Sequence, residues 1–368
     1  MATQEETGTG VAGLPRGLVV LLTVAAGMIG IAGLKAFSGT VGPMFLAIVV
    51  VVVLAPIHGA VARRGAPSWL AMTALLAASL GVIAVILGSV AWAAIELVTL
   101  LSGETYESQL SQTQEDLADL ADRFGVTGDD LDSVVEGIDL GSVASQLTSA
   151  LSGVLGVLGT LSVIILMLLF VVMDADKFSR ALRSVTAEKP AVVDALRNFA
   201  SSTRSYFVVA TIFGLIVAVF DVVALLIMGI PLALVWGVLS FITNYIPNVG
   251  FILGLIPPAL LGFFEGGWQL SLWVIVVYSV INVVIQSIIQ PKFVGDAVGL
   301  SATLTFVSLM FWAWVIGPLG ALLAVPLTLF GKALLMDIDP TTQWAAPLIS
   351  LDGSGSADEV ADVGDEGR

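Results

Sequence analysis

The feature that most constrains this chain is a series of long apolar runs with very few charges. A helix that crosses a bilayer needs roughly 20 mostly apolar residues, because the hydrocarbon offers no partners for backbone polar groups. Only 12% of the residues are charged, against about 25% in soluble domains. The chain is therefore expected to be an all-α polytopic membrane protein. The runs that approach or exceed the spanning length are 17–34, 41–57, 69–101, 151–173, 205–230 and 267–290.

Two further apolar stretches are interrupted by residues that break helices. Residues 231–264 contain Asn-Tyr-Ile-Pro-Asn at 244–248, and residues 302–335 contain Gly-Pro-Leu-Gly at 317–320 and a further proline, Pro326. Each arm is too short to cross a bilayer alone, and proline disfavours helix at the residue before it. We expect two Pro/Gly-broken re-entrant hairpins beside about six full transmembrane helices. The alternative for the first break is an ordinary interfacial loop between two tilted helices.

The polar segments divide the rest of the chain. The segment after residue 101 has apolar residues at helical spacing among acidic ones. The segment 174–204 is amphipathic, with basic and apolar faces, and Pro190 is expected to start its second helix. The expected regions are an N-terminal tail (1–16), three transmembrane helices (17–101), an acidic soluble helical insert (102–150), a fourth transmembrane helix (151–173), amphipathic basic helices (174–204), a membrane core with both broken hairpins (205–335) and an acidic, largely disordered C-terminal tail (336–368).

The distribution of Lys and Arg predicts the orientation of the chain in the cell membrane. If the N-terminus is cytoplasmic and both hairpins are re-entrant, the basic segment 174–204 and most other cations fall inside. Only Lys35 and Arg123 then fall outside, which matches the positive-inside rule. Both termini are therefore predicted to be cytoplasmic, and the acidic insert extracytoplasmic.

Composition and motifs exclude several classes of function. The net charge of −15 argues against nucleic acid as a partner, because phosphates need Lys and Arg. The chain has no cysteine and one histidine, so a thiolate or His-cluster metal site is not expected, nor any cofactor. The sequence contains no Gly-rich phosphate loop, no His-Glu-x-x-His and no Gly-x-Ser-x-Gly elbow, so we do not expect an enzyme. Without a nucleotide domain, any transport is passive or driven by ion gradients.

Several polar residues within the apolar core are candidates for a solute or ion path. Asp221 lies in the middle of the run 205–230, where a carboxylate costs at least about 2.5–3.5 kcal/mol on insertion scales. It could exchange a proton or bind sodium, or it could be a hydrogen-bonded helix contact. Asn282, Gln286 and Gln290 recur every four residues and share a helix face, which could line a polar path or only bond to neighbouring helices. The first break contributes Asn244, Tyr245, Pro247, Asn248 and Gly250, and the expected structural hinges are Pro291, Gly317, Pro318, Gly320 and Pro326.

A set of motifs in the second half resembles the autoinducer-2 exporter family of membrane transporters, which includes PerM-like permeases. The motifs are Trp236-Gly237, residues 244–250, Ile256-Pro257-Pro258, Gln290-Pro291-Lys292, Val298-Gly299-Leu300 and residues 317–326. The resemblance covers residues 205–335 most strongly and implies that this segment is a transport core in a homo-oligomeric carrier. At Leu300-Ser301-Ala302 relatives often carry a His-Pro pair, so a histidine-dependent mechanism is not carried over.

The combined prediction is a secondary carrier for a small polar solute, with export of an autoinducer-2-like signal molecule implied by the resemblance. A sodium/proton antiporter with Asp221 as the titrating group is the first alternative. A membrane pore or a non-transporting scaffold is the second. The expected partners are the solute, sodium ion or a proton, the lipid bilayer and further copies of the chain.

Overall fold

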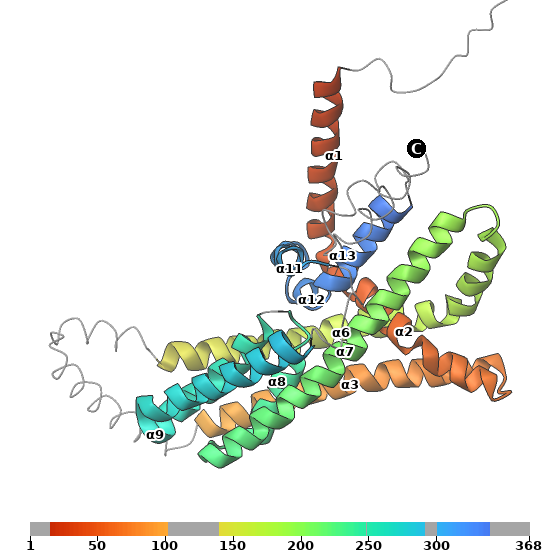
Figure 1. The fold of residues 1–368 in the computed structure, drawn as a ribbon. Helices are drawn as coiled ribbons and strands as arrows, with labels where there is room; N and C mark the ends of the chain where they lie inside the picture. The colour runs from red at the N-terminus through yellow and green to blue at the C-terminus, as the bar shows by residue number, and fades with distance from the viewer. Residues whose placement is uncertain (1–14, 102–139, 248, 291–299, 339–368) are drawn as a thin grey trace, which may run out of the picture.

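The computed structural model describes residues 15–101, 140–247, 249–290 and 300–338, and every regular element in these ranges is a helix (Figure 1). Most of the acidic insert, Asn248, Pro291 and the tail beyond 338 lie outside the described residues. The elements are α1 (Arg16–Ala36), α2 (Ser38–Arg63), α3 (Ser68–Leu101), α6 (Leu140–Val185), α7 (Pro190–Met228), α8 (Ala233–Thr243), α9 (Gly250–Asn282), the π-helix η1 (Val283–Ile289), α11 (Ala302–Ile316), α12 (Pro318–Leu322), α13 (Ala324–Lys332) and the π-helix η2 (Ala333–Asp337).

Five helices in the described part of the chain are long and apolar enough to cross a membrane. They are α1, α2, the first part of α3, α7, and α9 with the start of η1, although α9 is divided in two at Gly266 and Gly267. Their outward faces carry many exposed Leu, Ile, Val and Phe side chains, as helices in contact with lipid must. The predicted all-α polytopic membrane fold is confirmed.

The helices α6 and α7 are longer than the sequence pattern suggested. α6 has 46 residues and continues without interruption from the fourth apolar segment into the basic segment. α7 has 39 residues and begins at Pro190. At about 1.5 Å per residue, α7 is about 58 Å long, so both helices extend well beyond a hydrocarbon layer about 30 Å thick. The segment 174–204 therefore forms the end of α6 and the start of α7. The sequence has no glycine or proline between residues 160 and 189 that would end α6.

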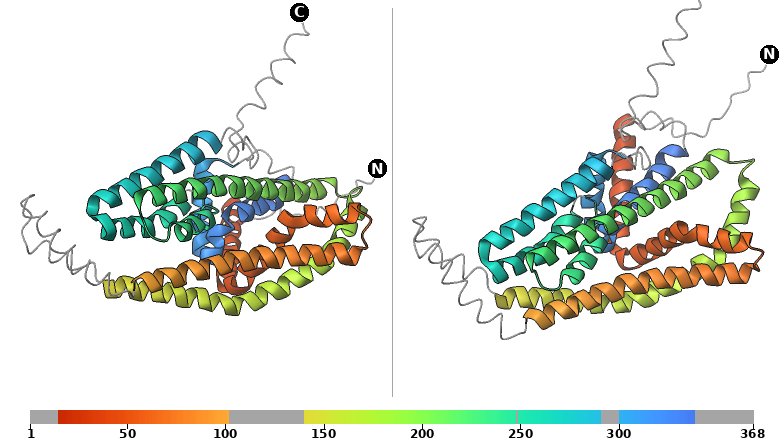
Figure 2. Two further views of the ribbon diagram at one scale, coloured as in Figure 1. Left: turned by 90° about the horizontal axis from the view of Figure 1, so that it is seen from below. Right: turned by 60° about the horizontal axis from the view of Figure 1, so that its bottom comes forward.

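The first broken hairpin consists of α8 and the first arm of α9, joined by residues 244–249. A second reversal follows at Gly266 and Gly267, where φ is +68° at Gly267, so that α9 is two arms and only the second continues into η1. Figure 2 shows these arms beside α7. The hairpin is tight because Gly250 has no side chain: a Cβ there would lie 1.9 Å from the Thr243 carbonyl oxygen.

The second broken hairpin consists of α11 and the pair α12 and α13. Gly317 makes the break with a φ of +81°, and Pro318 then starts α12. Gly320 allows α12 to lie against α11, since a Cβ there would lie 1.9 Å from the Trp312 carbonyl oxygen. The second interruption falls at Leu323, not at Pro326, which lies in the first turn of α13. Proline is tolerated there because the first N–H groups of a helix have no partner within it.

Two clusters of buried side chains fix these hairpins to the long helices. One joins α2 and the start of α7 to the second hairpin, through Phe45, Phe199 and Leu323 among others. The other joins the end of α7 to α8 and both arms of α9, with Trp236 and Tyr278 almost fully buried. The two hairpins are therefore anchored to different parts of one helix, α7.

A polar contact also ties α7 to α2. Pro56 lies inside α2 and has no N–H to donate to the Val52 carbonyl, four residues earlier. The Arg204 guanidinium of α7 donates to this carbonyl from 3.4 Å. Arg204 thus supplies the hydrogen bond that the proline removes.

Candidate functional site: a polar ladder along α7

The middle of α7 contacts both broken hairpins. The Tyr206 hydroxyl donates to the Tyr245 carbonyl at 2.8 Å, and the Phe207 ring centroid lies 6.0 Å from that of Tyr245. The same two α7 residues, Tyr206 and Phe207, pack against the buried cluster of the second hairpin. Tyr245 follows the last turn of α8, where carbonyls lack partners within the helix, so Tyr206 satisfies an acceptor that the break leaves open.

A second rung of polar contacts surrounds Asn244, the residue that ends α8. The Gln286 side-chain amide of η1 donates to the Asn244 carbonyl oxygen and, at 2.7 Å, to that of Asn282. The Asn282 amide donates to the Tyr278 backbone carbonyl at 2.9 Å. Gly214 of α7 makes room for this group, because a Cβ there would lie 2.9 Å from the Asn244 amide nitrogen. The predicted shared face of Asn282 and Gln286 therefore exists, and it reaches the first hairpin.

The third rung contains Asp221. Its carboxylate is fully buried, and the Ser240 hydroxyl of α8 donates to Oδ2 at 2.5 Å. The other oxygen, Oδ1, has no hydrogen-bond partner, and neither has the buried Tyr278 hydroxyl on the facing arm of α9. A buried polar atom without a partner costs about 1–3 kcal/mol. Two unsatisfied groups of this kind, one from α7 and one from α9, distinguish the Asp221 rung from ordinary helix packing.

Together these groups form what we call the polar ladder: Tyr206, Thr211 and Asp221 of α7, Ser240, Asn244 and Tyr245 of the first hairpin, and Tyr278, Asn282 and Gln286 of α9 and η1. Thr211 shares a hydrogen bond of 2.8 Å with the Tyr245 hydroxyl. The ladder extends from Tyr206 to Asp221 along α7, which at about 1.5 Å per residue is about 22 Å. For comparison, the hydrocarbon layer of a bilayer is about 30 Å thick.

The structure brings five of the predicted path residues into the ladder: Asp221, Asn244, Tyr245, Asn282 and Gln286. Pro247 and Gly250 shape the turn beside it. Gln290 follows η1 and is half-buried. The sequence reasoning missed Tyr206, Thr211, Ser240 and Tyr278. A usable signal existed for the last two, because Ser240 precedes Asn244 by four residues and Tyr278 precedes Asn282 by four.

The two arms of the second hairpin are joined by a separate group of hydrogen bonds. The Thr328 hydroxyl accepts from the Trp312 indole at 3.1 Å, and the Ser308 hydroxyl contacts both Thr328 and the Ala324 carbonyl. These bonds join α11 to α13 across the break at Gly317. Within the described residues, no group of three or more His, Asp or Glu side chains lies close enough to hold a metal ion.

Comparison with known proteins places the geometry in context. A family model described as "AI-2E family transporter" matches residues 18–339. The chain is 28% identical over 319 residues to the "AI-2 transport protein TqsA" of Escherichia coli K12, an alignment covering 87% of this chain and 92% of the relative. It is 29% identical over 333 residues to the "Putative transport protein" of Haemophilus influenzae, covering 89% and 95%.

Proposed function

This chain belongs to the AI-2E family of membrane transporters, and from that premise we propose that its polar ladder carries a small polar solute across the membrane. We propose outward transport of an autoinducer-2-like signal molecule, because TqsA, a relative aligned over most of both chains, is named for AI-2 transport. The sequence motifs at 244–250 and 317–326 support the same assignment, since both fall on the breaks that shape the core.

The observation that carries the proposal is the ladder itself. Hydroxyl, amide and carboxyl groups from α7, the first hairpin and the α9–η1 segment follow one another over about 22 Å of helix. A hydroxylated solute that leaves water can exchange its hydrogen bonds for these groups, which lowers the penalty for entering the membrane. Transporters commonly build their sites at interrupted helices of this kind.

We further propose that Asp221 couples transport to a proton or a sodium ion. Its free Oδ1 can hold a proton or contribute to a cation site, whereas Oδ2 is occupied by Ser240. An ionisable group inside a membrane core is a functional candidate by default, because its burial is expensive. The same property supports the second candidate function, sodium/proton exchange without an organic solute.

Two features of assembly complete the proposal. We propose cytoplasmic termini, supported by the concentration of Lys and Arg in the segment 174–204. We also propose a homo-oligomer in which α1 contacts another copy. Gly27, Gly30 and Gly33 of α1 face open space within 4 Å, and such small residues allow close contact between membrane helices.

The test is efflux from proteoliposomes loaded with labelled autoinducer-2, measured with and without an imposed proton or sodium gradient. Saturable efflux that responds to one gradient supports a coupled carrier. The matched pair Gln286→Ala and Val283→Ala locates the path, since both residues lie in η1 and Val283 is not part of the ladder. Efflux no faster than from loaded liposomes without the protein would exclude signal export. Proton movement on addition of sodium would then support sodium/proton exchange.

A further inference from the structure

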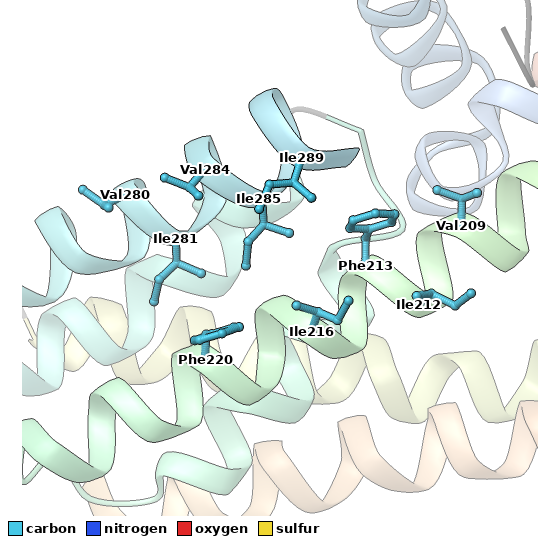
Figure 3. Close-up of a pocket in the computed structure, with 10 residues that line it drawn as sticks. All are labelled: Val209, Ile212, Phe213, Ile216, Phe220, Val280, Ile281, Val284, Ile285 and Ile289. Carbon is cyan, nitrogen blue, oxygen red and sulfur yellow. The ribbon is translucent and has the colours of Figure 1, made fainter. Parts of the chain in front are cut away.

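A large apolar groove lies between α7 and the α9–η1 segment. Its volume is about 680 Å³, and every one of its ten lining side chains is Val, Ile or Phe (Figure 3). Phe213 and Ile285 form a buried floor and pack against each other, while Ile212, Phe220 and Val280 at the rim are each more than half exposed. The groove is thus closed at its floor and open toward the surroundings of the protein.

The chemistry of the lining defines what can fill the groove. Water is held in a cavity by two to four polar partners, and no lining side chain offers one. A polar solute meets the same obstacle. Both walls belong to helices that are apolar and long enough to cross a membrane, so the medium at the open rim is hydrocarbon. The occupant is therefore a hydrocarbon group.

The sizes of the lining side chains indicate whether a lipid chain or a helix of another copy of the protein fills the groove. Membrane helices that pack against each other use small residues, which let their backbones approach. The groove contains no Gly, Ala, Ser or Thr, in contrast to the open glycine face of α1. Branched and aromatic side chains leave an irregular furrow that a flexible chain can follow and a rigid helix cannot. We propose that the groove binds one acyl chain of a membrane lipid.

This site has a direct connection to the polar ladder. Ile285 of the floor immediately precedes Gln286, which donates to Asn244. Both lie in η1, a π-helix, and short π segments are rare and occur frequently at functional sites. An acyl chain in the groove contacts Ile281, Ile285 and Ile289 on the outer face of this segment. On its inner face, Gln286 bonds to the first hairpin. The lipid is a structural ligand of that contact.

The experiment uses the absence of cysteine in the chain, which makes single-cysteine labelling clean. The full-length variants Ile212→Cys and Leu215→Cys are labelled with bimane in detergent and titrated with phosphatidylcholine that carries bromine on its acyl chains. The two positions lie three residues apart in α7 and are 52% and 56% exposed, and only Ile212 lines the groove. Val280→Cys and Val283→Cys form a second pair on the opposite wall, 55% and 54% exposed.

We expect half-maximal quenching of the groove probes at a severalfold lower ratio of lipid to detergent than for their controls. Adding Ile216→Trp, which fills the groove, should remove that difference. Identical quenching curves within each pair would overturn the proposal, because ordinary boundary lipid treats both positions alike. Groove probes that stay unquenched at all ratios, while Ile212→Cys forms disulfides between subunits, would also overturn it and assign the groove to a second copy.

Discussion

The hydrogen bond between Asn244 and Gln286 is the contact most specific to the proposed path, and its energy can be measured by a double-mutant cycle. It joins the broken end of α8 to η1, 42 residues away in the sequence. Side-chain hydrogen bonds within membranes average about 0.6 kcal/mol and reach about 1.7 kcal/mol in such cycles. We expect a coupling energy in this range, which changes the folding constant roughly 3-fold to 16-fold.

The variants are Asn244→Ala, Gln286→Ala and the double mutant, unfolded by sodium dodecyl sulfate in mixed dodecyl maltoside micelles and followed by tryptophan fluorescence. The effect of Asn244→Ala on the end of α8 is common to both arms of the cycle and cancels. Pairing Asn244→Ala with Val283→Ala provides a control cycle in which the coupling should be near zero. A coupling below about 0.3 kcal/mol for Asn244 and Gln286, within the usual error of additivity, would refute the contact and with it the second rung of the ladder.

Three further predictions follow from single residues. Asp221→Asn keeps an oxygen for Ser240 but removes the ionisable group, so efflux should lose its dependence on the imposed gradient while the protein keeps a cooperative unfolding transition. Gradient-dependent efflux in this variant would remove Asp221 from the coupling. Gly250→Ala places a Cβ 1.9 Å from the Thr243 carbonyl oxygen and should lower stability by about 1–3 kcal/mol or more, whereas Gly81→Ala in α3, which meets nothing within 4 Å, should be neutral or stabilising; equal effects in detergent unfolding would contradict the tight hairpin. Arg204→Met should lower stability by about 1–3 kcal/mol in detergent unfolding. The same change should cost less in a Pro56→Ala background, where the N–H of residue 56 can donate to the Val52 carbonyl. An equal cost in both backgrounds would show that Arg204 does not stabilise the protein through Val52.

Local signals predicted the two breaks well. Pro247, Gly317 and Pro318 disrupt helices through their own backbone chemistry, so their effect is visible without knowledge of neighbours. The shared face of Asn282 and Gln286 follows from helix geometry alone. The role of Pro326 was harder to predict, because a proline can either interrupt a helix or lie in its first turn. Here the helix breaks at Leu323, so Pro326 lies in the first turn of α13.

Tertiary contacts were harder to predict. Ser240 and Tyr278 share helix faces with the predicted path residues Asn244 and Asn282, but their position around Asp221, 19 residues before Ser240, follows only from packing between helices. The extent of α6 was missed for a different reason. The change from apolar to charged residues at Asp174 marks a change of surroundings, but it does not end a helix whose backbone bonds continue.

The brevity of α8 has a consequence for the order in which the protein is built. With 11 residues, α8 is about 16 Å long and cannot be inserted as an independent span. α7 precedes α8 in the chain, so Asp221 enters the membrane with α7 before the hairpin folds and Ser240 bonds to it. Until then, the apolar side chains of α7 must offset the cost of placing the carboxyl group in the membrane, which is about 2.5–3.5 kcal/mol. Folding of the first hairpin onto α7 then lowers this penalty, because the Ser240 hydroxyl bonds to one of the two carboxyl oxygens. Closure of the hairpin is therefore the step of biogenesis that stabilises the buried carboxyl group.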